Sequence, residues 1–317
     1  MATSTSRVRP ARRPAPLPGS PGATIAPTGK VAVESIKTHE LTVGIVGAGR
    51  VGTAMGAALA RAGHRITGAS GRSDAAVARI ANRLPGAVLR RAADVVRHAD
   101  LVIFAVPDDV LPPLIAHLGE SGAFRPGVIV AHTSGAHGIG ILHPAMTFTG
   151  AESDVDRLTA GISFGVTAPD ELSGVAADLV AELGGTAEWV PDDRRALYHA
   201  ALAHGANHLV TLVNEAMDRL RDAGVVHPEQ VLGPLLRAAL DNTLAMGDAA
   251  LTGPVSRGDA GTVAKHLDVL AAHAPDSVPS YRALARRTAD RAIAAGRLAA
   301  TDAEPLLGVL ASRPADV

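Results

Sequence analysis

The 317-residue sequence contains no cysteine, which excludes disulfides, thiol nucleophiles, iron–sulfur clusters and cysteine-ligated zinc. Aromatic residues make up only 2% of the chain, so few side chains are available to stack on single-stranded bases. The formal charge of −1 gives no basic field to attract nucleic acid or an anionic membrane. The longest strongly apolar stretch, Leu101–Val106, is far shorter than the roughly 20 residues of a membrane helix. We therefore expect a soluble, cytoplasmic protein without nucleic-acid or membrane partners.

The first 38 residues differ from the rest of the chain. They are rich in proline and arginine and contain no acidic residue before Glu34. No apolar run of signal-peptide length follows the arginines, although an organelle-import leader would have a similar composition. We expect residues 1–38 to be a disordered tail.

Short apolar runs then alternate with helical patterns as far as Pro191. The runs are Leu41–Val46, Arg65–Ala69, Leu101–Val106, Val128–Ala131, Gly161–Val166 and Glu188–Val190. This alternation predicts βαβ units around a parallel sheet, so residues 39–191 are expected to form an α/β domain.

The remaining residues, 192–317, predict helices alone. The expected helices run from Asp192 or Asp193 to Gly224, over Pro228–Met246 with a break at Gly233-Pro234, over Asp259–Ala272 and Ser277–Ala295, and after Thr301. We expect this all-α domain to bind substrate and to form a homodimer.

The hexapeptide Gly47-Ala48-Gly49-Arg50-Val51-Gly52 follows the first predicted strand and opens a helix. In this context G-x-G-x-x-G predicts a dinucleotide site, with the pyrophosphate at the helix N-terminus. Gly47, Gly49, Arg50, Val51 and Gly52 are the candidate phosphate-binding residues. A glycine-rich turn without a ligand is the alternative.

The end of the second strand indicates which dinucleotide binds. An NAD site expects a carboxylate there, but the sequence has Ser70, Arg72 and Ser73. Arg72 can face a 2′-phosphate as a planar donor, which favours NADP. Ser73 can equally cap the next helix, and Asp74 is the one residue that does not fit the interpretation.

Two further loops lie at the same predicted edge of the sheet. Ala105, Val106 and Pro107 end a buried strand where they can line the nicotinamide ribose, although a plain strand terminator is as good an explanation. The segment His132-Thr133-Ser134-Gly135 and the nearby His143 add polar side chains, and we count Ser134 with the cofactor residues.

In the helical half, His199, Ala203 and Asn207 recur every four residues on one predicted helix face. His204 and His208 have the spacing of a metal pair, but no Glu or third ligand accompanies them, so we expect no metal. Arg257 lies in a glycine- and proline-rich loop between two helices and can clamp a carboxylate.

The ordered motifs GAGRVG, AVPDD, HTSG, LHPAMTF, YHAALAHGAN and LTGPVSRGD resemble the Rossmann-like proteins with a DUF2520 C-terminal domain. The resemblance covers residues 40 to 300 and extends distantly to 6-phosphogluconate dehydrogenase, pyrroline-5-carboxylate reductase and ketopantoate reductase. It implies reduction of 2-dehydropantoate to pantoate with NADPH, in coenzyme A biosynthesis. The wider superfamily often has a Lys four residues before an Asn on this helix, and here that position is Ala203.

We therefore expect an NADP-dependent oxidoreductase acting on a small carboxylate substrate. His199 is the preferred proton donor and His143 the second choice, while Asn207 polarises the carbonyl and Arg257 holds the carboxylate. The alternatives are an imine reductase of the pyrroline-5-carboxylate type, a deazaflavin–NADP hydride-exchange enzyme, and an NADPH-sensing module without turnover.

Overall fold

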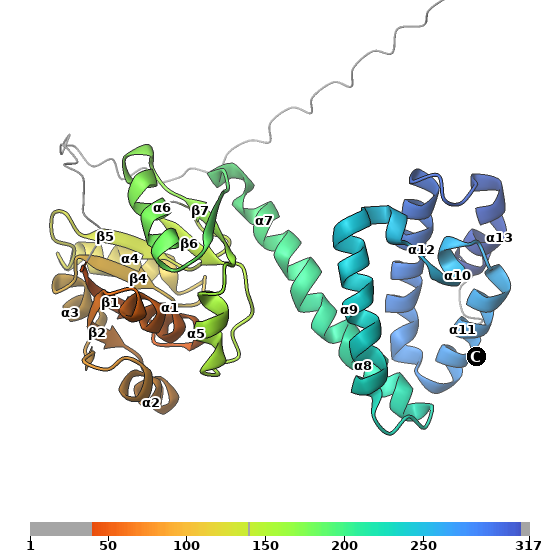
Figure 1. Cartoon of the computed structure of the whole chain (residues 1–317), viewed down its shortest axis with the longest axis horizontal. Coiled ribbons are helices and arrows are strands. Elements are labelled where there is room, and N and C mark those ends of the chain that lie inside the picture. The colour runs from red at the N-terminus through yellow and green to blue at the C-terminus, as the bar shows by residue number, and fades with distance from the viewer. Residues whose placement is uncertain (1–39, 139, 312–317) are drawn as a thin grey trace, which may run out of the picture.

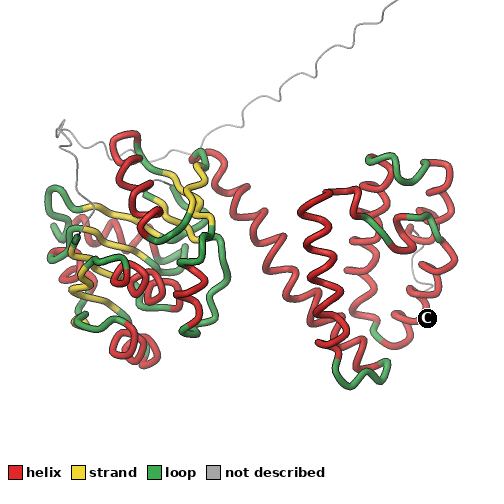
Figure 2. Tube along the Cα trace, viewed as in Figure 1, coloured by secondary structure: helices red, strands yellow, loops and turns green. Residues whose placement is uncertain are grey.

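The computed structural model describes residues 40–138 and 140–311. The tail expected over residues 1–38 lies outside these residues. Within the described residues, all strands lie before residue 190, and the helical half that follows contains helices and loops alone (Figure 2). The two halves are joined by α7 (Arg195–Leu202) and α8 (His208–Asp222), which run from one to the other (Figure 1). The expected Rossmann-type α/β domain followed by an all-α domain is confirmed.

The α/β half is built on one sheet of eight strands. They are β1 (Thr42–Val46), β2 (Arg65–Ser70), β3 (Val88–Leu89), β4 (Leu101–Phe104), β5 (Ile129–His132), β6 (Ile141–Pro144), β7 (Ser163–Thr167) and β8 (Thr186–Trp189). Their order in the sheet is β3-β2-β1-β4-β5-β6-β7-β8. The first six strands are parallel as expected. Strand β7 pairs antiparallel with β6, and β8 pairs parallel with β7.

Two of these strands were not anticipated. Val88–Leu89 is only two residues long, and the segment containing His143 and Pro144 was expected to be a loop. The latter expectation is wrong because β6 pairs with β7 along its whole length, from Ile141 opposite Thr167 to Pro144 opposite Phe164. Such pairing depends on a partner more than 20 residues away, which local propensity does not reveal.

Helices cover both faces of the sheet. They are α1 (Arg50–Arg61), α2 (Asp74–Arg83), α3 (Ala92–Arg97), α4 (Leu111–Glu120), α5 (Ser153–Leu158) and α6 (Ser173–Glu182). One core cluster joins Val43 and Ile45 of β1 to α1, α2, α5 and α6. The opposite cluster joins Val46 and Val102 to α3 and α4. Alternate residues of β1 thus face opposite layers, as in a doubly covered sheet.

The helical half continues with α9 (Pro228–Met246), α10 (Gly253–Ser256), α11 (Ala260–His273), α12 (Val278–Ala294) and α13 (Ala300–Ala311). The break expected at Gly233-Pro234 is wrong, since α9 runs through Pro234. Gly233 has no β-carbon, so the usual clash between a proline ring and the preceding side chain is reduced. Val263 and Leu306 are among the residues that form the separate core of this half. No helix in the described residues is long and apolar enough to cross a membrane.

The helix expected from Asp192 to Gly224 is not uniform. It opens with a 3-10 turn at Asp192–Arg194, and a π-helical turn at Ala203–Asn207 separates α7 from α8. Turns of the π type inside longer helices are frequent at functional sites.

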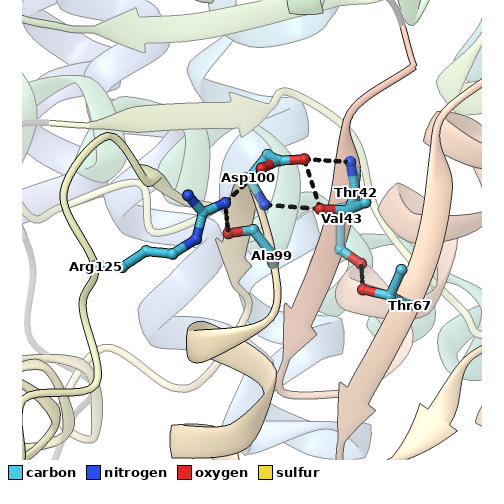
Figure 3. A network of polar contacts seen from close by, with 6 residues as sticks. All are labelled: Thr42, Val43, Thr67, Ala99, Asp100 and Arg125. Atoms are coloured by element: carbon cyan, nitrogen blue, oxygen red, sulfur yellow. Dashed lines mark hydrogen bonds and ion pairs between the residues drawn. The ribbon is translucent and has the colours of Figure 1, made fainter.

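The strands β1 and β4 are fastened at their amino ends, away from the edge where the glycine loop lies. Asp100 accepts hydrogen bonds from the Thr42 backbone N–H at 3.0 Å and from the Thr42 hydroxyl at 2.6 Å (Figure 3). Arg125 donates to the Ala99 carbonyl oxygen at 2.9 Å and pairs with Asp100. The Thr42 hydrogen bonds, ahead of the contribution of Arg125, hold the pKa of Asp100 below its ordinary value.

Candidate active site

The glycine loop between β1 and α1 has the shape that a dinucleotide-binding turn needs. Gly47 has a φ of 99°, and a β-carbon on it would lie 2.5 Å from the Ala105 carbonyl oxygen. A β-carbon on Gly52 would collide with the carbonyl oxygen of Gly47. Gly49 differs, since a β-carbon there would meet nothing within 4 Å. Gly47 and Gly52 are therefore required by packing, whereas Gly49 faces open space at the N-cap of α1.

The N–H groups of the glycine loop differ in whether they already have a hydrogen-bond partner. The N–H groups of Gly47 and Ala48 both donate to the Ser70 carbonyl oxygen, at 3.2 and 2.7 Å. Among the described residues, no hydrogen bond is found for the N–H groups of Arg50 and Val51 in the first turn of α1. These two donors and the positive end of the helix dipole can hold a pyrophosphate.

The end of β2 carries the residues expected to select the cofactor. Arg72 is exposed, and Ser73 caps α2 by accepting a hydrogen bond from the Ala76 N–H at 3.2 Å. Asp74 is the first residue of α2, where a carboxylate is stabilised by the helix dipole. Arg79 was not anticipated: its Nε donates to the Ala48 carbonyl oxygen at 3.3 Å and brings a second guanidinium to the glycine loop.

The loops after β4 and β5 lie beside the glycine loop. Ala105 contacts Gly47 closely, and Val106 and Pro107 follow it at the carboxyl edge. Ser134 is buried, and its hydroxyl accepts hydrogen bonds from the N–H groups of Ala136 and His137, both at 3.2 Å. The Ser134 hydroxyl therefore shapes its own loop.

Three ring side chains gather at the same edge. The Nδ1 atom of His143, on β6, lies 3.1 Å from the Tyr198 hydroxyl of α7. The ring of His199 lies edge-to-face with the His143 ring, with centroids 6.2 Å apart. A β-carbon on Gly135 would lie 2.5 Å from Cδ2 of His199 and 3.2 Å from Nε2 of His143. Gly135 therefore allows both histidines to approach the loop after β5.

The surroundings of His143 disfavour its protonated form. Burial, and after it the positive charges of Arg195 and His199, lower the pKa of His143 to about 4, while Asp108 acts in the opposite direction. His143 is therefore neutral at physiological pH and is a poor source of protons. The lowered pKa weighs against His143 as the acid.

The other predicted catalytic residues are dispersed. Asn207 ends the π-helical turn and is exposed. From His199 to Ala203 the chain is α-helical, and four residues make slightly more than one turn of about 3.6 residues. From Ala203 to Asn207 the helix is of the wider π type, and four residues make slightly less than one turn. The two deviations offset each other, so Asn207 stays close to the helix face of His199. Arg257 lies at the end of α10 in the helical half and lines a cavity of about 390 Å³ with Arg297 and Asp302. Figure 1 shows α10, which precedes Arg257, on the far side of the helical half from α7, which carries His199.

His204 and His208 lie together, with their Nδ1 atoms 3.2 Å apart. Within the described residues, no group of three or more potential ligands that could hold a metal ion is found. The pair has the geometry of adjacent side chains one helical turn apart.

Sequence reasoning missed Arg195, and it assigned no role to Tyr198 or to Gly135. Gly135 was noted only as part of the polar segment that follows the predicted strand Val128–Ala131. For Arg195 there is none, since an arginine at the start of a helix is ordinarily solvated.

Family comparisons match the two halves separately. Residues 27–152 match the model of a Rossmann-like domain, and residues 162–288 match a domain of unknown function, DUF2520. No curated protein sequence matches the chain.

Solved structures resemble the chain over most of its length. A Bacteroides fragilis protein assigned as an NADP oxidoreductase is 20% identical and covers 80% of this chain and 99% of its own, with a TM-score of 0.68. Protein TM1727 of Thermotoga maritima is 19% identical, with 80% and 100% coverage and a TM-score of 0.59. An imine reductase of Myxococcus stipitatus in complex with NADP+ is 17% identical, with 86% and 100% coverage and a TM-score of 0.55. At these identities the likeness establishes a shared fold.

Proposed function

We propose that this protein is an NADPH-dependent reductase of a small 2-oxo acid, with 2-dehydropantoate as the preferred substrate. One observation carries the proposal: a glycine loop with free N–H donors and a cluster of two histidines and a tyrosine lie at the same edge of one sheet. A cofactor bound along that edge meets polar side chains suited to a carbonyl.

The residues present fit NADP. The close approaches at Gly47 and Gly52 leave the loop without side chains toward Gly49, where a pyrophosphate has room. Ser70 stands where an NAD site has a carboxylate, and Arg72 is an exposed guanidinium available to a 2′-phosphate. The NADP oxidoreductase of B. fragilis and the NADP+-bound imine reductase of M. stipitatus share the fold, which is consistent with this choice.

The chemistry divides between the cofactor and the chain. When bound, NADPH supplies a hydride from the nicotinamide C4 to the carbonyl carbon. His199 supplies the proton that the resulting alkoxide needs, and Asn207 stabilises the carbonyl oxygen. Tyr198 holds His143 beside His199 and Gly135.

We further propose that the protein is a homodimer. Large apolar side chains on α7, α8 and α9 are exposed, namely Leu197, Leu209, Val210, Leu212, Val231, Leu235, Leu240, Leu244 and Met246. No residue of α8 is fully buried. A second copy packed against these helices would remove such exposed apolar side chains from water.

A second copy also accounts for the position of Arg257. The helices α7 and α8 span residues 195–222, or about 40 Å, and hold the helical half away from the glycine loop of its own chain. In a homodimer, Arg257 can clamp a substrate carboxylate bound beside His199 of the other copy.

An imine reductase is the second candidate, favoured by the fold shared with the M. stipitatus enzyme. Oxidation of NADPH should be monitored through the loss of its absorbance, with 2-dehydropantoate, other 2-oxo acids and cyclic imines as substrates. Turnover of 2-oxo acids alone supports the proposal. Turnover of imines alone would replace it with the second candidate, and nucleotide binding without any turnover would indicate a sensing module.

A further inference from the structure

Arg195 has an unusual position for an arginine. It is the first residue of α7 and is only 1% exposed. Among the described residues, it has the largest side chain that is fully buried. Its Nη2 donates to the Gly165 carbonyl oxygen at 3.3 Å. Among the described residues, Nε and Nη1 have no hydrogen-bond partner.

Such a burial is costly for stability. A guanidinium removed from water needs acceptors for its donors, and one carbonyl oxygen satisfies only one of five. The burial lowers the pKa of Arg195, and the nearby Tyr198 and Asp192 oppose that shift. Groups kept in the interior at such a cost often serve the site that they surround.

Arg195 lies directly over a tyrosine that belongs to the site. Its guanidinium carbon is 5.0 Å from the centroid of the Tyr198 ring. Tyr198 packs so closely on β7 that a β-carbon on Gly165 would collide with its hydroxyl. Burial raises the pKa of Tyr198, and the charge of Arg195 and a backbone hydrogen bond from Gly165 act in the opposite direction, so the phenol stays protonated at neutral pH.

This arrangement favours one direction for the next hydrogen bond. The positive charge of the Arg195 guanidinium, 5.0 Å from the centroid of the Tyr198 ring, strengthens the Tyr198 O–H as a hydrogen-bond donor. The hydroxyl therefore donates to Nδ1 of His143, 3.1 Å away. A neutral imidazole that accepts at Nδ1 carries its proton on Nε2.

The Nε2 atom of His143 faces the candidate active site. It lies beside Gly135, in the direction from which His199 also approaches. We propose that Arg195 is a positioning residue that acts through Tyr198 to hold His143 as the neutral Nε2–H tautomer, which then donates a hydrogen bond to the substrate carbonyl oxygen. The donation to substrate rests on the proposed reductase function, whereas the tautomer does not.

The charge of Arg195 also bears on the protonation of His143. The groups that influence this ring are Arg195 and His199, which disfavour its charged form, Asp108, which favours it, and Tyr198, which is hydrogen-bonded to it. Removal of the guanidinium takes away one of the two unfavourable charges, while burial of the ring remains.

Nitrogen-15 NMR of the histidine rings tests the tautomer directly, without substrate or cofactor. The full-length protein is compared with Arg195→Met, Arg195→Lys and Tyr198→Phe, and His143→Gln assigns the resonance among 13 histidines. Arg194→Met is the matched control, since Arg194 is exposed and pairs with Asp193. We expect a neutral Nε2–H ring in the native protein and in the control, and a mixture of tautomers in Arg195→Met and Tyr198→Phe. The pKa of His143 should rise measurably above about 4 in Arg195→Met and return toward it in Arg195→Lys.

Stability and kinetics separate positioning from a merely structural role. The unfolding temperature of Arg195→Met should equal or exceed that of the native protein, because the substitution removes a buried charge with unpartnered donors. Its kcat should fall by up to about 100-fold with KM and NADPH affinity unchanged, since the hydrogen bond strengthens as the alkoxide forms.

Three results would overturn the inference. The first is an Nδ1–H tautomer of His143 in the native protein. The second is a His143 ring whose pKa and tautomer are unchanged in Arg195→Met. The third is a loss of stability in Arg195→Met that Arg195→Lys reverses, while the pKa and tautomer of His143 do not return to their native state. If no 2-oxo acid is turned over but the ring behaves as expected, the proposed function fails while the positioning role of Arg195 stands.

Discussion

Replacement of single glycines in the loop between β1 and α1 should separate cofactor binding from folding. Gly49 has extended backbone angles, with φ −76° and ψ −164°, and open space where its side chain would lie. Gly49→Val should therefore cost only about 1 kcal/mol of stability, as expected for a poorer N-cap. Gly52→Val should cost at least about 3 kcal/mol, because its β-carbon would collide with the carbonyl oxygen of Gly47.

The effect of Gly49→Val on binding should be much larger than its effect on stability. The new side chain occupies the space in front of the N–H groups of Arg50 and Val51, which are the donors available to a pyrophosphate. Hydrogen bonds to a charged group contribute about 1.5–3 kcal/mol each, so losing two raises the Kd for NADPH by about 10²- to 10⁴-fold.

Thermal unfolding followed by circular dichroism and calorimetric titration with NADPH measure the two effects. Gly174→Val is a suitable control, because Gly174 lies in α6 and a β-carbon there also meets open space. A folded Gly49→Val protein that binds NADPH as tightly as the native protein would refute the assignment of the loop. Equal destabilisation by Gly49→Val and Gly52→Val would refute the packing argument.

Four further predictions concern individual side chains. Arg72→Ala should reduce the preference for NADPH over NADH by about 10- to 100-fold, measured by titration with both, through loss of one charge-assisted contact; equal native affinities would contradict this. His199→Ala should lower kcat by about 10²- to 10⁴-fold with NADPH affinity intact in a binding titration, and full activity would move the proton donor elsewhere. Arg257→Ala should chiefly raise KM for the 2-oxo acid. At substrate concentrations well below KM, an equimolar mixture of refolded His199→Ala and Arg257→Ala chains should regain about a quarter of the native kcat/KM if each site uses both copies; no recovery would place both groups in one chain. The pKa of Asp100 is lowered in the folded protein, so Asp100 should stabilise the protein at pH values above its unfolded pKa of about 3.9 and lose that effect as the pH falls through the folded pKa. Denaturant titrations at decreasing pH should therefore show a shrinking difference in stability between the native protein and Asp100→Asn. A difference that stays constant with pH would contradict this prediction.

The parts of the candidate site that depend on nearby residues could be predicted from sequence. The glycine loop, Ser70 and Arg72 each follow a strand with a strong apolar pattern, and parallel strands bring their carboxyl ends to one edge. The meeting of His143 with His199 was anticipated only as proximity to that edge. Their contact depends on β6, which was expected to be a loop, and on its antiparallel pairing with β7.

Sequence alone therefore determined the two kinds of domain and the glycine-rich turn between β1 and α1, and it named the candidate histidines, because each arises from periodicity or from motifs a few residues long. The tertiary structure decided that Arg195 is buried beside Tyr198, that burial lowers the pKa of His143, and that α10, which precedes Arg257, lies far from α7 of the same chain. These features depend on strand pairing, on removal of side chains from water and on the length of a connecting helix. The burial of Arg195 against Gly165 of β7 and the approach of His143 to His199 join residues that are 30 or more positions apart, so no local pattern records them.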